Sequence, residues 1–115
     1  MIRGIRGAIT VDGNTSLAIE QATTELLNEL FFQNGIDTKL ISHIIFTLTE
    51  DLNAEFPAKI AREKLGLNDV AMMCFNELNV PGSLKMCLRV LVVLNCDESF
   101  VPRFVYLKDA KNLRG

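Results

Sequence analysis

Residues 70–94 read VAMMCFNELNVPGSLKMCLRVLVVL, which describes two apolar strands joined by a polar connection. The second strand, 86–94, is apolar at every position except Arg89. Successive strand residues point to opposite faces, so Arg89 has apolar neighbours on its own face and an entirely apolar face behind it. A strand that is apolar on both faces is usually covered on both faces. Each of the two faces of this strand must therefore be covered by another layer of residues.

Arg89 needs a partner in such a strand, because a buried guanidinium without partners costs several kcal/mol on an order-of-magnitude scale. Two readings follow from the pattern. Arg89 forms a structural ion pair with an acidic residue, for which Glu77 is the nearest candidate since it directly follows the first strand. Alternatively, Arg89 belongs to an anion-binding site built into the sheet. The strand pattern by itself favours neither.

The composition predicts a single folded domain spanning 1–115, with 49% apolar and 23% charged residues. The net charge of −2 gives no basic surface for nucleic acid or anionic lipid, so an anion site must gather its cations locally. Three cysteines without a CxxC motif indicate reduced thiols and a cytoplasmic protein. The single histidine, His43, argues against zinc. The first ten residues lack the apolar core of a signal peptide or a membrane span.

Hydrophobic periodicity predicts five strands, one long helix and one short one. The expected strands cover 2–11, 42–49, 70–75, 86–94 and 104–107. The long helix spans 17–33, and the short one begins at Pro57 and ends at Gly66. The predicted fold class is α+β, a mixed five-stranded sheet backed by one long helix. The tail from residue 108 is charged, and we expect it to be mobile, with Leu113 as its only anchor.

One long helix covers only one face of the sheet. The strands that are apolar on both faces therefore leave a second face uncovered, and a 115-residue chain has nothing left to place there. We infer a homo-oligomer whose sheets pack together, with sites at the contacts between copies. Lys59 and Arg62 share a face of the short helix. They form either an ordinary solvated face or a cationic rim that attracts an anionic ligand.

Four segments, read in order, carry a family resemblance. They are RGIRGAIT at 3–10, FPAKIAR at 56–62, CFNELNVPGSLKMCLRV at 74–90, and the pair YL at 106–107 followed by LR at 113–114. Together they resemble the trimeric α/β-barrel class of chorismate mutase. The resemblance spans nearly the whole chain and implies a pseudo-α/β-barrel homotrimer with active sites between adjacent subunits. It also implies an enzyme of aromatic amino acid biosynthesis that rearranges chorismate to prephenate.

The resemblance further implies the site residues. Arg89, Glu77 and Arg6 correspond to the family's catalytic positions. The positions that bind substrate correspond to Phe56, Ala58, Lys59, Arg62, Cys74, Tyr106, Leu113 and Arg114. Met73 departs from the family pattern, since a small polar residue is common there beside the pocket.

The chemistry of chorismate agrees with these residue types. The rearrangement is one concerted step that requires no nucleophile, metal or cofactor, so none is expected. It requires a compact substrate and a cation facing the ether oxygen. Two alternatives remain: a catalytically silent trimeric anion-binding module, and an imine-processing enzyme on a similar barrel.

Overall fold

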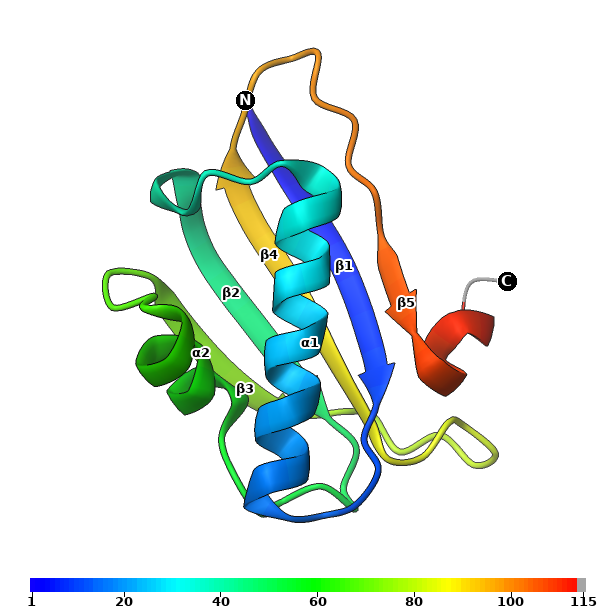
Figure 1. The fold of residues 1–115 in the computed structure, drawn as a ribbon. Helices are drawn as coiled ribbons and strands as arrows, with labels where there is room; N and C mark the ends of the chain where they lie inside the picture. The colour runs from blue at the N-terminus through cyan, green and yellow to red at the C-terminus, as the bar shows by residue number, and fades with distance from the viewer. Residues whose placement is uncertain (114–115) are drawn as a thin grey trace.

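The computed structural model describes residues 1–113 and contains one mixed sheet of five strands in the order β3-β2-β4-β1-β5 (Figure 1). The strands are β1 (Ile2–Thr10), β2 (Ile41–Leu48), β3 (Ala71–Asn76), β4 (Cys87–Asn95) and β5 (Val105–Leu107). The central strand β4 runs antiparallel to both β1 and β2, while β3 is parallel to β2 and β5 is parallel to β1. The mixed five-stranded sheet is therefore confirmed. β3 and β4, the two strands of the 70–94 stretch, are not paired, because β2 lies between them.

The long helix α1 (Ser16–Asn34) crosses one face of the sheet (Figure 1). Thr15 caps its first turn, accepting a hydrogen bond from the backbone N–H of Ala18 at 3.1 Å. Gly35 ends it with φ 56°, in the left-handed region that glycine adopts readily. The predicted apolar stripe faces the sheet, with these residues buried: Ile19, Ala22, Thr23, Leu26, Leu27 and Leu30.

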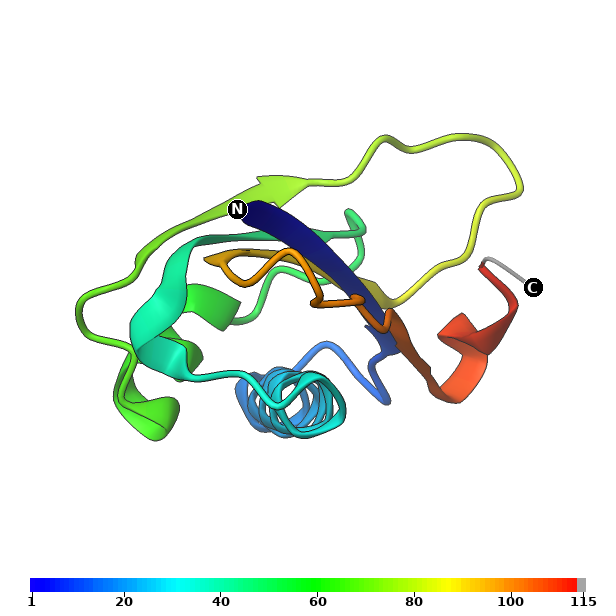
Figure 2. The ribbon, with the colours of Figure 1, turned by 90° about the horizontal axis from the view of Figure 1, so that it is seen from above.

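A second helix, α2 (Pro57–Leu65), lies on the same side of the sheet as α1 (Figure 2). Its buried residues Pro57, Ile60 and Ala61 help to close that side. The sheet is thus backed by two helices, not by one long helix alone as predicted. The short helix had been expected, but its apolar side is large enough to share in covering the core.

Neither α1 nor α2 covers the opposite face of the sheet, which a short 3-10 helix near the end of the described chain contacts at Ala8 and Cys87. Residues on the helix side, such as Phe46 and Val92, are fully buried. Their neighbours on the other side, including Ile45, Leu91 and Val93, are only half-buried, and Met73 is 60% exposed. We call this second side the open face. Its apolar character agrees with the pattern read from the sequence.

The tail is more firmly attached than predicted. Lys108–Asn112 form a short 3-10 helix, η2, in which Ala110 is buried. The Asp109 backbone N–H donates to Thr10 Oγ1 at 3.1 Å, and Lys108 Nζ lies 3.2 Å from Asp12 Oδ2. Leu113 is therefore not the only anchor. The end of β1 supplies polar partners that the composition of the tail could not reveal.

Candidate active site

Arg89 is the third residue of β4, on the open face, directly between Thr47 of β2 and Ala8 of β1. Its Nε is 3.3 Å from Glu77 Oε2, and each of the two side chains is 25% exposed. Arg89 Nε is itself buried and makes no hydrogen bond with residues 1–113, so this contact is an ion pair only. The pairing of Arg89 with Glu77 predicted from the sequence is thus present.

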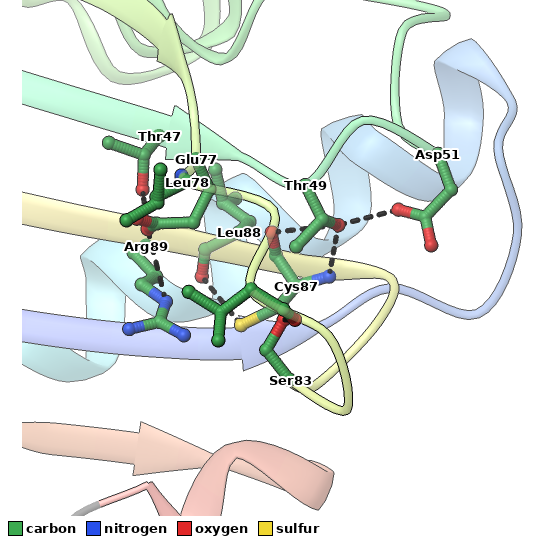
Figure 3. A network of polar contacts seen from close by, with 10 residues as sticks. Thr47, Thr49, Asp51, Glu77, Leu78, Ser83, Cys87, Leu88 and Arg89 are labelled. Atoms are coloured by element: carbon green, nitrogen blue, oxygen red, sulfur yellow. Dashed lines mark hydrogen bonds and ion pairs between the residues drawn. The ribbon is translucent and has the colours of Figure 1, made fainter.

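Glu77 is held by its backbone and by both carboxylate oxygens. Its N–H donates to Leu48 O at 2.8 Å, which extends the β2–β3 pairing one residue beyond β3. Oε1 accepts from the Leu78 N–H at 3.2 Å, and Oε2 accepts from Thr47 Oγ1 at 2.7 Å (Figure 3). Two hydrogen bonds and the ion pair with Arg89 therefore fix the orientation of this carboxylate.

Arg6 and Tyr106 share the open face with Arg89. Arg6 is opposite Leu91 in the β1–β4 register, and Ala8 is aligned with both Arg89 and Tyr106. Directly aligned strand residues project to the same side. The Tyr106 hydroxyl is buried and has no hydrogen-bond partner in residues 1–113. Because buried polar groups are normally paired, this hydroxyl has room for a hydrogen-bond partner from outside residues 1–113.

The tail reaches the same group of residues. Ala8, Cys87 and Ala110 form a small buried cluster, and Tyr106, Leu84 and Leu113 pack against it. Burial raises the pKa of the Cys87 thiol, although nearby Arg89 lowers it in part. Leu113 thus packs against the same cluster as Tyr106. Arg114 falls outside the residues that the structure describes.

The remaining predicted residues lie on the helix side of the sheet. Cys74 is aligned with the fully buried Phe46, so it faces α2, and with Phe56 it lines a cleft of about 370 Å³. Burial raises the pKa of the Cys74 thiol, and a hydrogen bond from the Ala58 backbone N–H offsets this in part. The thiol is therefore neutral near pH 7 and suits a contact role, not a nucleophilic one.

The two cations of α2 differ in their contacts. Lys59 Nζ lies 3.6 Å from Glu55 Oε2, four residues earlier, in an ion pair whose lysine is exposed and whose glutamate is partly buried. Arg62 is exposed and has no ion pair with residues 1–113. Both positions are accessible to an anion that arrives from solvent.

The structure thus brings the predicted residues together as two groups. The open-face group contains Arg6, Glu77, Arg89, Tyr106 and Leu113. The helix-side group contains Phe56, Ala58, Lys59, Arg62 and Cys74. The sheet separates the groups, so the two groups of one chain do not surround a common ligand.

The open-face group also contains a residue that the sequence reasoning did not identify, Thr47, which binds Glu77. It stood out in no motif, and its position opposite Arg89 depends on the register between β2 and β4. The alternation predicted for residues 42–49 assigns Thr47 to one face of its strand. It does not say which residue of a neighbouring strand lies beside it.

Comparison with known proteins identifies the family of this chain. The family model for chorismate mutase type I matches residues 2–115. The chain belongs to the chorismate mutase type I family. Within it, the chorismate mutase AroH of Thermus thermophilus is 47% identical over 116 residues, which cover 99% of this chain and 94% of that protein. The chorismate mutase AroH of Bacillus subtilis (strain 168) is 40% identical over 118 residues, covering 99% and 91%.

The solved structures give the same result for the fold. A chorismate mutase from Clostridium thermocellum superposes with a TM-score of 0.88 at 45% identity, covering 95% of this chain and 97% of that one. The type I chorismate mutase resemblance read from the four sequence segments is therefore confirmed. The comparisons do not favour the imine-processing or silent-module alternatives.

Proposed function

We propose that this protein rearranges chorismate to prephenate at sites completed by a neighbouring copy of the chain. The observation that carries the proposal is the open-face group, in which two arginines, a carboxylate and a buried tyrosine hydroxyl share one side of an otherwise apolar sheet. The reaction is an isomerisation that breaks a carbon–oxygen ether bond as a carbon–carbon bond forms. No proton needs to be transferred, so the side chains act by position and charge.

Arg89 is the residue proposed to face the ether oxygen. Negative charge grows on that oxygen as its bond breaks, and a preorganised donor stabilises the transition state more than the ground state. The strand backbone on both sides of Arg89 is paired, with β1 on one side and β2 on the other, which limits its movement. Arg6 and Tyr106 are proposed to bind the substrate carboxylates, and Glu77 to accept a hydrogen bond from the ring hydroxyl.

A homotrimer would unite the two groups of site residues. The open-face group of one subunit would meet the helix-side group of the next, so that Phe56, Ala58 and Cys74 form a wall. Lys59 and Arg62 would then stand at the rim and attract the dianionic substrate. The apolar open face supports this assembly, since Leu91 and Val93 lie uncovered in a single chain. Leu113 and Arg114 would close the site from the tail.

The remaining expectations accompany this proposal. The chain would act as one domain over residues 1–115, without a cofactor, and in the cytoplasm. Among residues 1–113, no helix has the length and apolar character required to cross a bilayer.

The test is direct, because chorismate absorbs ultraviolet light that prephenate does not. Purified protein at micromolar concentration should remove the chorismate absorbance and produce prephenate in equal amount. An Arg62→Ala variant, altered only at the rim, should retain the rearrangement with a raised KM. Absence of chorismate consumption by the unmodified protein would contradict the proposed function.

A further inference from the structure

We infer that Thr47 is a positioning residue for the proposed reaction, which acts by fixing the Glu77 carboxylate. The inference rests on the proposed function. Thr47 Oγ1 donates to Glu77 Oε2 at 2.7 Å, and the same oxygen is 3.3 Å from Arg89 Nε (Figure 3). Thr47 thus binds the carboxylate at the atom that also contacts the arginine.

Because of its location, Glu77 needs a contact to its side chain in addition to its backbone hydrogen bond. It follows the last residue of β3 and opens the connection to β4, where most residues from 78 to 85 are exposed. Its backbone is fixed by one hydrogen bond, but a glutamate side chain has several rotatable bonds that cost entropy to hold. A charge-assisted O–H···O⁻ bond is short and strong, and Thr47 supplies one from near the end of β2, where its backbone is still flanked by both β3 and β4.

Thr47 also determines which part of Arg89 remains available. With Oε2 held beside Nε, the terminal nitrogens of Arg89 point away from Glu77 (Figure 3). A carboxylate that rotated freely could instead bind those terminal nitrogens in the bidentate manner that arginine favours. Such a pair would occupy the donors that the ether oxygen needs. The Thr47 hydroxyl therefore prevents Glu77 from occupying the terminal nitrogens of Arg89.

A purely structural explanation exists and makes different predictions. Threonine is common in strands because its branched side chain packs well there. Under that explanation the methyl and the shape of the residue matter, and the hydroxyl does not. Valine keeps the shape and removes the donor, while serine keeps the donor and removes the methyl.

The experiment compares the full-length protein with Thr47→Val and Thr47→Ser in steady-state kinetics with chorismate. Losing one hydrogen bond to a charged group should lower kcat in Thr47→Val by roughly tenfold or more. Thr47→Ser should stay within about twofold of the original, since an equivalent donor remains. Thr24→Val on α1, a half-buried threonine that lies apart from the site, is the matched control and should leave kcat unchanged.

A second measurement isolates the route through Glu77. A chorismate analogue whose ring hydroxyl is methylated cannot donate to Glu77, so Thr47→Val should cost less on this analogue than on chorismate, and the loss that remains is the part that acts through Arg89. If Thr47→Val fails to fold, Thr47→Ala takes its place in both measurements. Unchanged kcat in the folded valine variant would overturn the inference, and so would an equal loss in the serine variant. A protein that does not consume chorismate at all would remove the proposed function itself, a failure distinct from these two.

Discussion

Arg89 is a polar residue inside an apolar strand, and the structure shows how the fold accommodates it. The residue is not fully buried, and one carboxylate lies close to it. Removing the arginine would leave Glu77 still bonded to Thr47 and to the Leu78 N–H. The pair is therefore less essential to folding than a buried ion pair whose partner would be left without any hydrogen bond.

This contact pattern makes Arg89→Ala a clean test. We expect the variant to fold and to lose roughly a hundred- to a thousandfold in kcat, the usual effect of removing one preorganised donor. Arg89→Lys should recover little, because a single ammonium cannot reproduce the planar fork of guanidinium donors. Circular dichroism checks the fold and steady-state kinetics the rate. An active Arg89→Met/Glu77→Gln double variant would contradict electrostatic catalysis by Arg89.

The partly buried Cys74 and the buried Cys87 predict how stability depends on alkaline pH. Burial raises the pKa of Cys74 and of Cys87 above the ordinary thiol value of 9.0. Above pH 9.0 the unfolded thiols lose protons that the folded ones keep, so the unfolded state is favoured increasingly. We expect Tm to fall as pH rises beyond that value. The decline should be shallower in Cys87→Ala; an identical slope there would contradict this assignment.

At the level of elements, a polar clamp joins the start of α1 to the start of α2. The Asn14 side chain accepts hydrogen bonds from the backbone N–H groups of Asn53 and Ala54, at 2.9 and 3.0 Å. Glu55 Oε1 accepts from the Phe56 N–H at 3.0 Å, and Oε2 accepts from Ser16 Oγ at 3.1 Å. Glu55 thereby caps a helix whose own N-cap residue, Phe56, has no polar side chain. The clamp therefore fixes the positions of Phe56 and Lys59 at the start of α2.

The stability that this clamp provides consequently depends on the ionisation of Glu55, which is lost at acid pH. The Phe56 N–H, the Ser16 hydroxyl and Lys59 together lower the pKa of Glu55 below its ordinary value of 4.5. A lowered pKa stabilises the fold above 4.5, and that contribution is lost as pH falls below it. We expect Glu55→Gln to lower Tm at neutral pH and to flatten its decline in acid. Glu63→Gln, at an exposed position on α2, should match the original protein at every pH.

The sequence predicted the individual helices and strands better than it predicted their arrangement. Alternation fixed the faces of β1, β2 and β4, and the caps placed the ends of α1 within a residue, because both signals are local. Which strands pair, and with what register, depends on residues far apart in the chain. The position of Thr47 opposite Arg89 and the attachment of η2 to Thr10 were unpredictable for this reason.

For the whole molecule, the separation of the site residues by the sheet makes assembly a requirement of the proposed function. Neither group alone makes up the proposed site, and the open face exposes apolar residues such as Met73 and Phe75. We expect a homotrimer at micromolar concentration in analytical ultracentrifugation. Specific activity should fall on dilution into the range where the trimer dissociates. A monomer whose specific activity is independent of concentration would contradict the shared site.

The sheet order has one more consequence, for the protein during its synthesis. β1 is the first strand to be made, yet it pairs only with β4 and β5, so that Ile2 meets Asn95 and Gly7 meets Val105. β2 likewise pairs with β3 and β4, which are made after it. A nascent chain that ends before residue 87 therefore carries two apolar strands, β1 and β2, that have not yet met the central β4. Loops this long close slowly, and unpaired strands invite association between chains. The sheet of this protein therefore cannot be completed during synthesis until β4 and β5 have both been made.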